Sequence, residues 1–239
     1  MKRALITGAS GMLGAALARR LAAQGLHVYL HAHTRADQAR RTAEEIIATG
    51  GSAEVLVFDV VNGEQTGAAL AAALERGPIQ VVINNAGVHD DAVLPGMRPE
   101  QWRRVIDVSL NGFYNVTQPL LMPMIATRWG RVISISSVSA LVGNRGQVNY
   151  AAAKAGLHGA TRTLAVEVAS RGITVNAIAP GVIAAGMTAR AFDTARIEAL
   201  VPMKRAGTPE EVAALAGFLA SEEAGYISGQ IISINGGMI

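Results

Sequence analysis

The chain has 239 residues, of which 50% are hydrophobic and 16% charged, and its formal net charge is +3. This composition excludes a disordered protein, and the length favours one domain with a sizeable buried core. Because the sequence contains no cysteine, disulfides, thiolate metal sites and thiol nucleophiles are excluded. No apolar run approaches the ~18 residues of a membrane span, and no basic run interleaved with aromatics suggests nucleic acid. We therefore expect a cytoplasmic protein without a membrane span.

Short β-branched runs alternate with longer, alanine-rich stretches of helical period along the whole chain. Strands are predicted at residues 3–7, 28–32, 53–58, 81–84, 131–135, 174–178 and 231–234. Helices are predicted at residues 12–24, 36–49, 64–74, 100–127, 150–170 and 209–220. We expect the fourth helix to bend or break at Pro119 and Pro123. Residues 181–207 show no clear pattern, and a stretch of that length in a compact domain is typical of a substrate lid.

The repeated strand–helix–strand pattern predicts an α/β fold of one domain spanning residues 1–239. We expect a doubly wound parallel sheet of about seven strands with helices on both faces. The strands are apolar throughout, which fits strands that are covered on both sides.

A glycine-rich turn joins the first strand to the first helix and contains Gly8, Ser10, Gly11, Met12, Leu13 and Gly14. Glycine lets the backbone turn tightly and approach a pyrophosphate, while the helix N-terminus supplies N–H donors and a partial positive charge. An ordinary strand-to-helix turn is the alternative. The position after a first strand and before a helix favours dinucleotide binding in a Rossmann-type fold.

Two further segments belong to the same edge of the predicted sheet. Asn85, Ala86 and Gly87 follow the fourth strand, and Asp59 and Val60 follow the third. Ligands of doubly wound sheets bind at the carboxyl ends of the strands. Each segment taken alone is typical of a turn, so the cofactor-binding interpretation depends on their shared edge.

The end of the second strand bears on the choice of cofactor. Enzymes that use NAD place an acid here to hold the ribose 2′-hydroxyl. In this chain His33, Thr34 and Arg35 occupy the stretch, and the first carboxylate is Asp37. A cation and a hydroxyl suit a 2′-phosphate, so we predict NADPH (NADP⁺) as the cofactor. The alternative is an exposed polar loop.

A catalytic group is predicted from Ser137, Tyr150 and Lys154. Tyr150 and Lys154 are one helical turn apart and share a face. Free tyrosine has a pKa near ~10, and a nearby ammonium lowers it, which makes Tyr150 a candidate general acid. Ser137 lies just beyond the fifth strand and could orient a carbonyl oxygen. On spacing alone, Tyr150 and Lys154 could simply belong to the surface of an amphipathic helix. Together with Ser137 and a nucleotide-binding turn, they predict a site that reduces a carbonyl group.

These segments resemble the short-chain dehydrogenase/reductase family over essentially the full chain. The resemblance lies in residues 7–14, residues 84–87, Ser137, Tyr150 with Lys154, and Pro180 with Gly181. Within the family the chain is most similar to 3-oxoacyl-(acyl-carrier-protein) reductases, through residues 143–150, 171–181 and 234–238.

The resemblance implies an NADPH- or NADH-dependent reductase that forms a homotetramer, with Ser137, Tyr150 and Lys154 as catalytic residues. It also implies cofactor contacts from Asp59, Asn85, Ala86, Gly87, Lys154, Pro180, Gly181 and Ile183. Arg128 and Arg171 match two arginines that meet the acidic acyl carrier protein in such reductases. Generic solvated charges are the alternative for both arginines.

Three positions depart from the family pattern. Met12 replaces the middle glycine of the nucleotide turn. Ser109 replaces an asparagine that helps to hold a water behind the catalytic lysine, so that either Ser109 or Asn111 would support the proton relay. Ala185 replaces a threonine that often binds the carboxamide, which leaves backbone groups or Thr188 for that contact.

The first functional hypothesis is the NADPH-dependent reduction of a 3-oxoacyl thioester on acyl carrier protein, in fatty-acid or polyketide-type synthesis such as aryl-polyene assembly. A short-chain reductase of small free ketones or alcohols is the alternative. A non-catalytic NADP(H) sensor is a remote third hypothesis, because fold does not fix function. No metal is expected: His27, His31 and His33 alternate along one strand without further ligands, as solvent-edge histidines would.

Overall fold

The computed structural model describes residues 1–184 and 194–239. Within these residues, parallel strands form one seven-stranded sheet in the order β3-β2-β1-β4-β5-β6-β7. The strands are β1 (Arg3–Ile6), β2 (His27–Ala32), β3 (Ser52–Val57), β4 (Val81–Asn84), β5 (Gly130–Ile135), β6 (Ile173–Pro180) and β7 (Ile231–Ile234). The strand order reverses between β1 and β4, which opens a crevice at their carboxyl ends. This sheet confirms the predicted doubly wound α/β fold.

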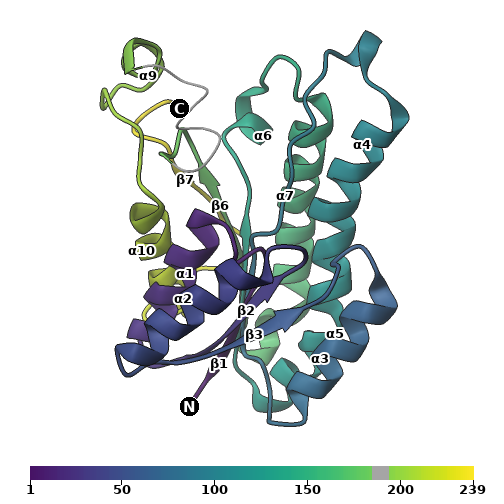
Figure 1. Cartoon of the computed structure of the whole chain (residues 1–239), viewed down its shortest axis with the longest axis vertical. Coiled ribbons are helices and arrows are strands. Elements are labelled where there is room, and N and C mark those ends of the chain that lie inside the picture. The colour runs from purple at the N-terminus through teal and green to yellow at the C-terminus, as the bar shows by residue number, and fades with distance from the viewer. Residues whose placement is uncertain (185–193) are drawn as a thin grey trace.

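Helices cover both faces of the sheet (Figure 1). One face carries α1 (Met12–Ala23), α2 (Ala36–Ala48) and α10 (Pro209–Leu219), and the other carries α3 (Gly63–Leu74), α5 (Gly112–Thr127) and α7 (Val148–Val168). Successive residues of β1 serve opposite layers: Ile6 packs with α1, α2 and α10, and Leu5 packs with α3, α5 and α7. Both side chains are fully buried, which explains why the strands lack polar alternation.

The predicted helix over residues 100–127 is interrupted, but not at its prolines. It consists of α4 (Pro99–Ile106), a π-helical segment (Asp107–Asn111) and α5. The expected position of the break was therefore wrong, since α5 runs through Pro119 and Pro123. Each proline removes a single bond to the carbonyl four residues earlier, and the remaining bonds hold the helix. Single π-turns inside helices often occur at functional sites.

Among the described residues, three short elements have no counterpart in the sequence pattern: α6 (Ser139–Val142), α9 (Thr194–Leu200) and the single turn Leu94–Gly96. The predicted helix over residues 150–170 ends in a further single turn, Ala169–Arg171. The predicted lid at 181–207 includes residues 185–193, which lie outside the described residues. On either side of that gap, Ile183 pairs with Gly207 in an isolated β-bridge. Across the described chain, no helix is long and apolar enough to cross a bilayer, and no three His, Asp or Glu side chains gather as metal ligands.

Candidate active site

The glycine-rich turn after β1 is joined to the loop after β4. The N–H groups of Asn85 and Ala86 each donate to Thr7 Oγ1 at 2.9 Å, and Asn85 Nδ2 donates to the Thr7 carbonyl at 2.8 Å. Gly8 adopts a φ of +65°, a conformation that L side chains rarely take. The two segments that the sequence assigned to one sheet edge thus form a continuous wall.

Glycine is sterically required where α1 meets this wall. A Cβ on Gly14 would lie 2.5 Å from the Gly8 carbonyl oxygen and 2.7 Å from Ala9 Cα. A Cβ on Gly8 would lie 3.0 Å from Ala86 Cα. These close approaches leave the backbone and the N-terminus of α1 open to the crevice, a cradle that fits a dinucleotide pyrophosphate.

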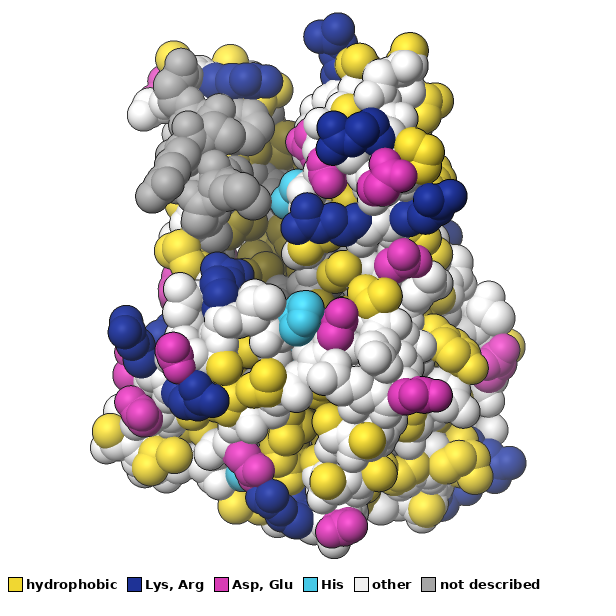
Figure 2. Space-filling model, turned by 45° about the vertical axis from the view of Figure 1, so that its right-hand side comes forward, with side chains coloured by type: hydrophobic (Ala, Val, Ile, Leu, Met, Phe, Trp, Pro, Cys, Tyr) yellow, Lys and Arg dark blue, Asp and Glu magenta, His cyan; other side chains and the backbone are white. Residues whose placement is uncertain are grey.

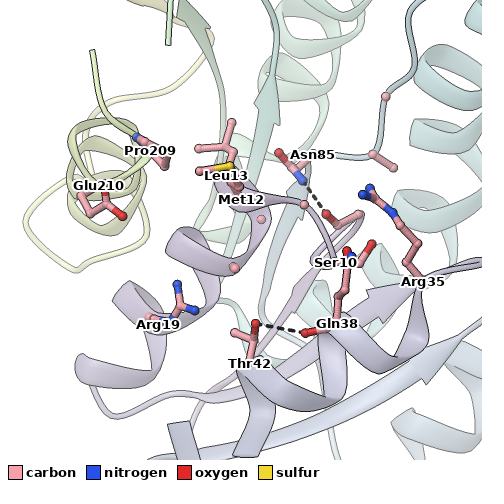
Figure 3. A pocket seen from close by; sticks show the side chains of 16 residues that line it. Ser10, Met12, Leu13, Arg19, Arg35, Gln38, Thr42, Asn85, Pro209 and Glu210 are labelled. Carbon is pink, nitrogen blue, oxygen red and sulfur yellow. Dashed lines mark hydrogen bonds between the residues drawn. The ribbon is translucent and has the colours of Figure 1, made fainter. Parts of the chain in front are cut away.

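A groove of about 820 Å³ runs along this cradle (Figure 3). The predicted residues that line it are Gly8, Ser10, Gly11, Met12, Leu13, Gly14, Arg35, Asn85, Ala86 and Gly87. The sequence analysis missed six lining residues: Ala15, Arg19, Gln38, Thr42, Pro209 and Glu210. Gln38 and Thr42 follow Arg35 at helical spacing on one face of α2, a signal that could have found them. Figure 3 shows Arg35 extending towards the turn beside Ser10.

The predicted cofactor residues that follow β2 and β3 do not all line this groove: His33, Thr34, Asp59 and Val60 are not part of its lining. The His33 ring is exposed, and its Nε2 lies 4.0 Å from Asp59 Oδ2. Asp59 Oδ1 accepts the Val61 N–H at 3.0 Å, so this carboxylate shapes the turn after β3. Of His33, Thr34 and Arg35, the three residues predicted to meet the 2′-phosphate, Arg35 is therefore the one that lines the groove.

His31 is part of the site, and its assignment as a solvent-edge histidine was wrong. It is 2% exposed, and its Nδ1 accepts the Gly8 N–H at 3.0 Å. Nε2 lies 2.9 Å from the Phe58 carbonyl oxygen and therefore carries the proton. Burial lowers the pKa of His31 to about 4, so the neutral ring joins the glycine turn to the end of β3.

A second cavity, of about 460 Å³, adjoins the groove and shares Leu13 with it. Its predicted lining residues are Ser137, Tyr150, Pro180, Gly181 and Ile183. Figure 2 shows the surface hollowed here, between the α4 side and the α9 side of the molecule. The carboxamide candidates Ala185 and Thr188 lie outside the described residues.

Two of the three predicted catalytic residues, Ser137 and Tyr150, line this cavity, and Lys154 lies close to Tyr150. Ser137 hydrogen-bonds to Tyr150, and Lys154 Nζ lies 5.6 Å from the centroid of the Tyr150 ring. Lys154 is buried, its Nζ donates to the Ile135 carbonyl at 2.8 Å, and desolvation lowers its pKa to about 8. The structure thus brings the three residues together.

The expectation that a nearby ammonium lowers the pKa of Tyr150 was wrong. Desolvation raises the pKa of Tyr150 to about 12, although the hydrogen bond from Ser137 acts in the opposite direction. The Lys154 ammonium donates to a backbone carbonyl, and at 5.6 Å from the ring centroid it favours the phenolate too weakly to outweigh the cost of burial. Tyr150 is consequently a fully protonated donor at neutral pH.

The π-helical segment places Ser109, and not Asn111, beside Lys154. Ser109 is buried, and its Oγ has no hydrogen-bond partner within the described residues. A Cβ on Gly87 would lie 3.3 Å from Lys154 Nζ and 3.8 Å from Ser109 Oγ, so both polar atoms border the same point. Asn111 is exposed and donates to Asp107 Oδ1 at 2.7 Å.

The two candidate docking arginines lie at the amino ends of the strands, whereas Ser137 lies at the carboxyl end of β5. Arg128 precedes β5 and Arg171 precedes β6, whereas Ser137 follows β5. Both arginines are exposed, and the Arg128 guanidinium donates to the Ser170 carbonyl at 3.1 Å. Within one chain, both arginines thus stand before the strands β5 and β6, and Ser137 stands after β5.

Comparison with known proteins agrees with this geometry. A family model described as "Enoyl-(Acyl carrier protein) reductase" matches residues 8–239. The chain is 44% identical over 236 residues to the 3-oxoacyl-[acyl-carrier-protein] reductase FabG of Aggregatibacter actinomycetemcomitans, with 98% of each chain covered. It is 44% identical over 241 residues to FabG of Pseudomonas aeruginosa PAO1, covering 99% of this chain and 97% of the relative. The Synechocystis 3-oxoacyl-[acyl-carrier-protein] reductase is 42% identical over 238 residues, with 99% and 96% covered.

The doubly wound sheet, the glycine cradle and the Ser–Tyr–Lys group define a nicotinamide-dependent oxidoreductase. With full-length matches of this kind, the chain belongs to the short-chain dehydrogenase/reductase family. This confirms the resemblance drawn from the sequence.

Proposed function

We propose that this enzyme reduces the 3-keto group of a 3-oxoacyl thioester on acyl carrier protein to the 3-hydroxyacyl form, with NADPH as the reductant. The observation that carries the proposal is the hydrogen-bonded Ser137–Tyr150 pair, with buried Lys154 one helical turn away, in the cavity beside the cradle. The relatives are named for reduction of this substrate, which supports its choice over the enoyl group in the family model's description.

The roles of the side chains follow from their environments. A bound nicotinamide supplies hydride to the carbonyl carbon. Ser137 and Tyr150 donate hydrogen bonds to the carbonyl oxygen, and Tyr150 gives it the proton that completes the alcohol. The Lys154 ammonium stabilises the phenolate that this transfer leaves behind.

Ser109 is proposed as the group that returns a proton towards Lys154. Its buried hydroxyl lacks a partner among the residues described and borders the same point as Lys154 Nζ. A hydroxyl both donates and accepts, so it can pass a proton along a chain of hydrogen bonds. Its shorter reach than asparagine leaves room for a water between the two groups.

NADPH is proposed over NADH because Arg35 lines the groove and no carboxylate stands at the end of β2. A guanidinium pairs well with a 2′-phosphate, while a 2′-hydroxyl gains little from it. At least a tenfold preference in kcat/KM for NADPH, reduced in Arg35→Ala, would support this choice. Equal efficiency with NADH would contradict it.

We further propose a homotetramer and a role in fatty-acid or polyketide-type synthesis, aryl-polyene assembly included. Large apolar side chains stand exposed on the outer helices: Tyr114 (64%) and Met122 (69%) on α5, and Val166 (82%) on α7. Exposed apolar surface of this kind is typical of subunit interfaces. Light scattering that gave the mass of a monomer would contradict the oligomer.

The decisive experiment follows NADPH absorbance with acetoacetyl-carrier protein and with small free ketones, for the wild type and Tyr150→Phe. Carrier-dependent turnover that is lost in Tyr150→Phe is the expected result. Turnover of the free ketones alone would favour the small-ketone reductase. NADPH binding without turnover of either substrate would favour the sensor.

A further inference from the structure

One side chain of the substrate cavity has no role in the steps above. His89 stacks on the catalytic Tyr150, with ring centroids 4.2 Å apart and planes 25° from parallel. Its ring lines the same cavity as Ser137 and Tyr150. A substrate carbonyl bound to Tyr150 would therefore have an imidazole next to it.

The contacts that hold α7 also fix the position of His89. Asn149 Nδ2 at the start of α7 donates to the Asp90 carbonyl at 2.9 Å. The Ala92 N–H donates to the Gly146 carbonyl at 2.9 Å. The residues that follow His89 are thus tied at two points to the segment that presents Tyr150.

Hydrogen bonds determine which nitrogen of His89 carries the proton. Gln147 Oε1 accepts from Ser139 Oγ at 3.1 Å and from Asn144 Nδ2 at 2.9 Å, which fixes the orientation of its amide. Gln147 Nε2 donates to Asp91 Oδ2 at 2.9 Å and lies 3.5 Å from His89 Nδ1. Facing an amide donor, Nδ1 accepts, so the proton of a neutral ring is on Nε2.

The Nε2–H of His89 has no hydrogen-bond partner among the residues that the structure describes. The ring is neutral, because burial and the charge of Lys154 lower the pKa of His89 against the opposing effect of Asp91. A half-exposed N–H donor in an otherwise mostly apolar cavity is the kind of group that fixes the orientation of a ligand.

We propose that His89 determines substrate specificity by donating its Nε2–H to the thioester carbonyl of the substrate. This inference rests on the proposed function. A 3-oxoacyl thioester has two carbonyls separated by one methylene; when the keto oxygen is bound by Ser137 and Tyr150, the thioester oxygen lies beside the ring stacked on Tyr150. A ketone without the second carbonyl cannot make this contact.

The test compares His89→Phe, which keeps a flat ring and loses the donor, with His89→Gln, which keeps an N–H donor. The substrates are the N-acetylcysteamine thioester of acetoacetate and cyclohexanone, which has no second carbonyl. The readout is kcat/KM for the thioester divided by kcat/KM for cyclohexanone. A general effect of the substitution on Tyr150 changes both values and cancels in this ratio. We expect His89→Phe to lower this ratio by roughly threefold to tenfold, the value of one hydrogen bond, and His89→Gln to retain more of it.

A ratio unchanged from the wild type in both variants would overturn the inference and leave the proposed function standing. If the wild type reduced cyclohexanone but not the thioester, the proposed function itself would fail. NADPH titration by fluorescence verifies that both variants fold and bind cofactor.

Discussion

Burial raises the pKa of Tyr150 and lowers the pKa of Lys154. We expect both shifts to determine how the rate of reduction depends on pH. With a pKa of about 12, Tyr150 stays protonated at every pH between 6 and 10. Lys154, with a pKa of about 8, loses its charge within that range. We therefore expect kcat/KM for reduction to fall as the pH rises through about 8, by roughly tenfold. Lys154→Met should be slower throughout and lack this decline, and a flat wild-type profile would contradict the argument.

The buried, neutral ring of His31 makes the stability of the fold depend on pH. The folded state lowers its pKa from 6.5 to about 4, so between these values the unfolded chain binds more protons than the folded one. Stability from this group is complete above pH 6.5 and is lost as the pH falls towards 4, by up to roughly 3 kcal/mol. Urea unfolding of the wild type and His31→Asn at pH 7 and pH 4.5 measures this loss. Parallel losses in both proteins would mean that His31 is not responsible.

At the scale of the element, the approach of α1 to the sheet depends on Gly14 more than on Gly11. A Cβ on Gly14 would meet three atoms at 2.5–3.0 Å, whereas one on Gly11 meets only the Gly8 carbonyl oxygen, at 3.5 Å. Gly11 also has an ordinary φ of −86°. We expect Gly14→Ala to destabilise the fold by about 1–3 kcal/mol and to weaken NADPH binding, with a smaller effect from Gly11→Ala. Thermal melts and cofactor titration measure both, and equal effects would contradict the steric argument.

The regular elements could be predicted because their signal is local. Apolar β-branched runs predicted the strands of the sheet, and the helix predicted at residues 209–220 corresponds to α10, which Thr208 begins in a capping box with Glu211. The π-helical segment was not predicted, although it carries Ser109, whose Oγ borders the same point beside Gly87 as Lys154 Nζ from a distant part of the chain. Propensity contains no information about such tertiary demands.

The residues of the candidate site likewise fall into those that local sequence predicts and those that depend on tertiary contacts. Glycines and the Tyr150–Lys154 spacing are visible in the sequence because backbone geometry and helical period require them. His31 and His89 were not recognised, because their roles arise from the Gly8 N–H in one case and the Tyr150 ring in the other. A histidine on a strand or loop has no periodic signature of such contacts.

Within one chain, the predicted catalytic residues and the exposed arginines lie at opposite ends of the strands. In an oligomer, the arginines of one subunit could lie near the active site of another. Ser137 and Tyr150 lie at the carboxyl edge of the sheet, and Arg128 and Arg171 at the amino edge. In a twofold pair packed through α5 and α7 with the axis across the helices, these helices run antiparallel. In the proposed oligomer, the amino ends of the strands of one subunit would then lie beside the carboxyl ends of the strands of its partner, where the proposed acidic carrier would approach.

From this arrangement we expect Arg128→Glu/Arg171→Glu to raise KM for acetoacetyl-carrier protein by about fivefold relative to the KM for the free thioester. Arg41→Glu, an exposed arginine on α2, is the matched control and should shift the two KM values together. The difference should shrink at high salt, because exposed charges are screened. Since the arginines would serve the neighbouring active site, the effect must vanish in a variant shown by light scattering to be monomeric, such as one carrying Met122→Glu and Val166→Glu. Carrier selectivity that survived in the monomer would show that the carrier docks on the catalytic subunit itself.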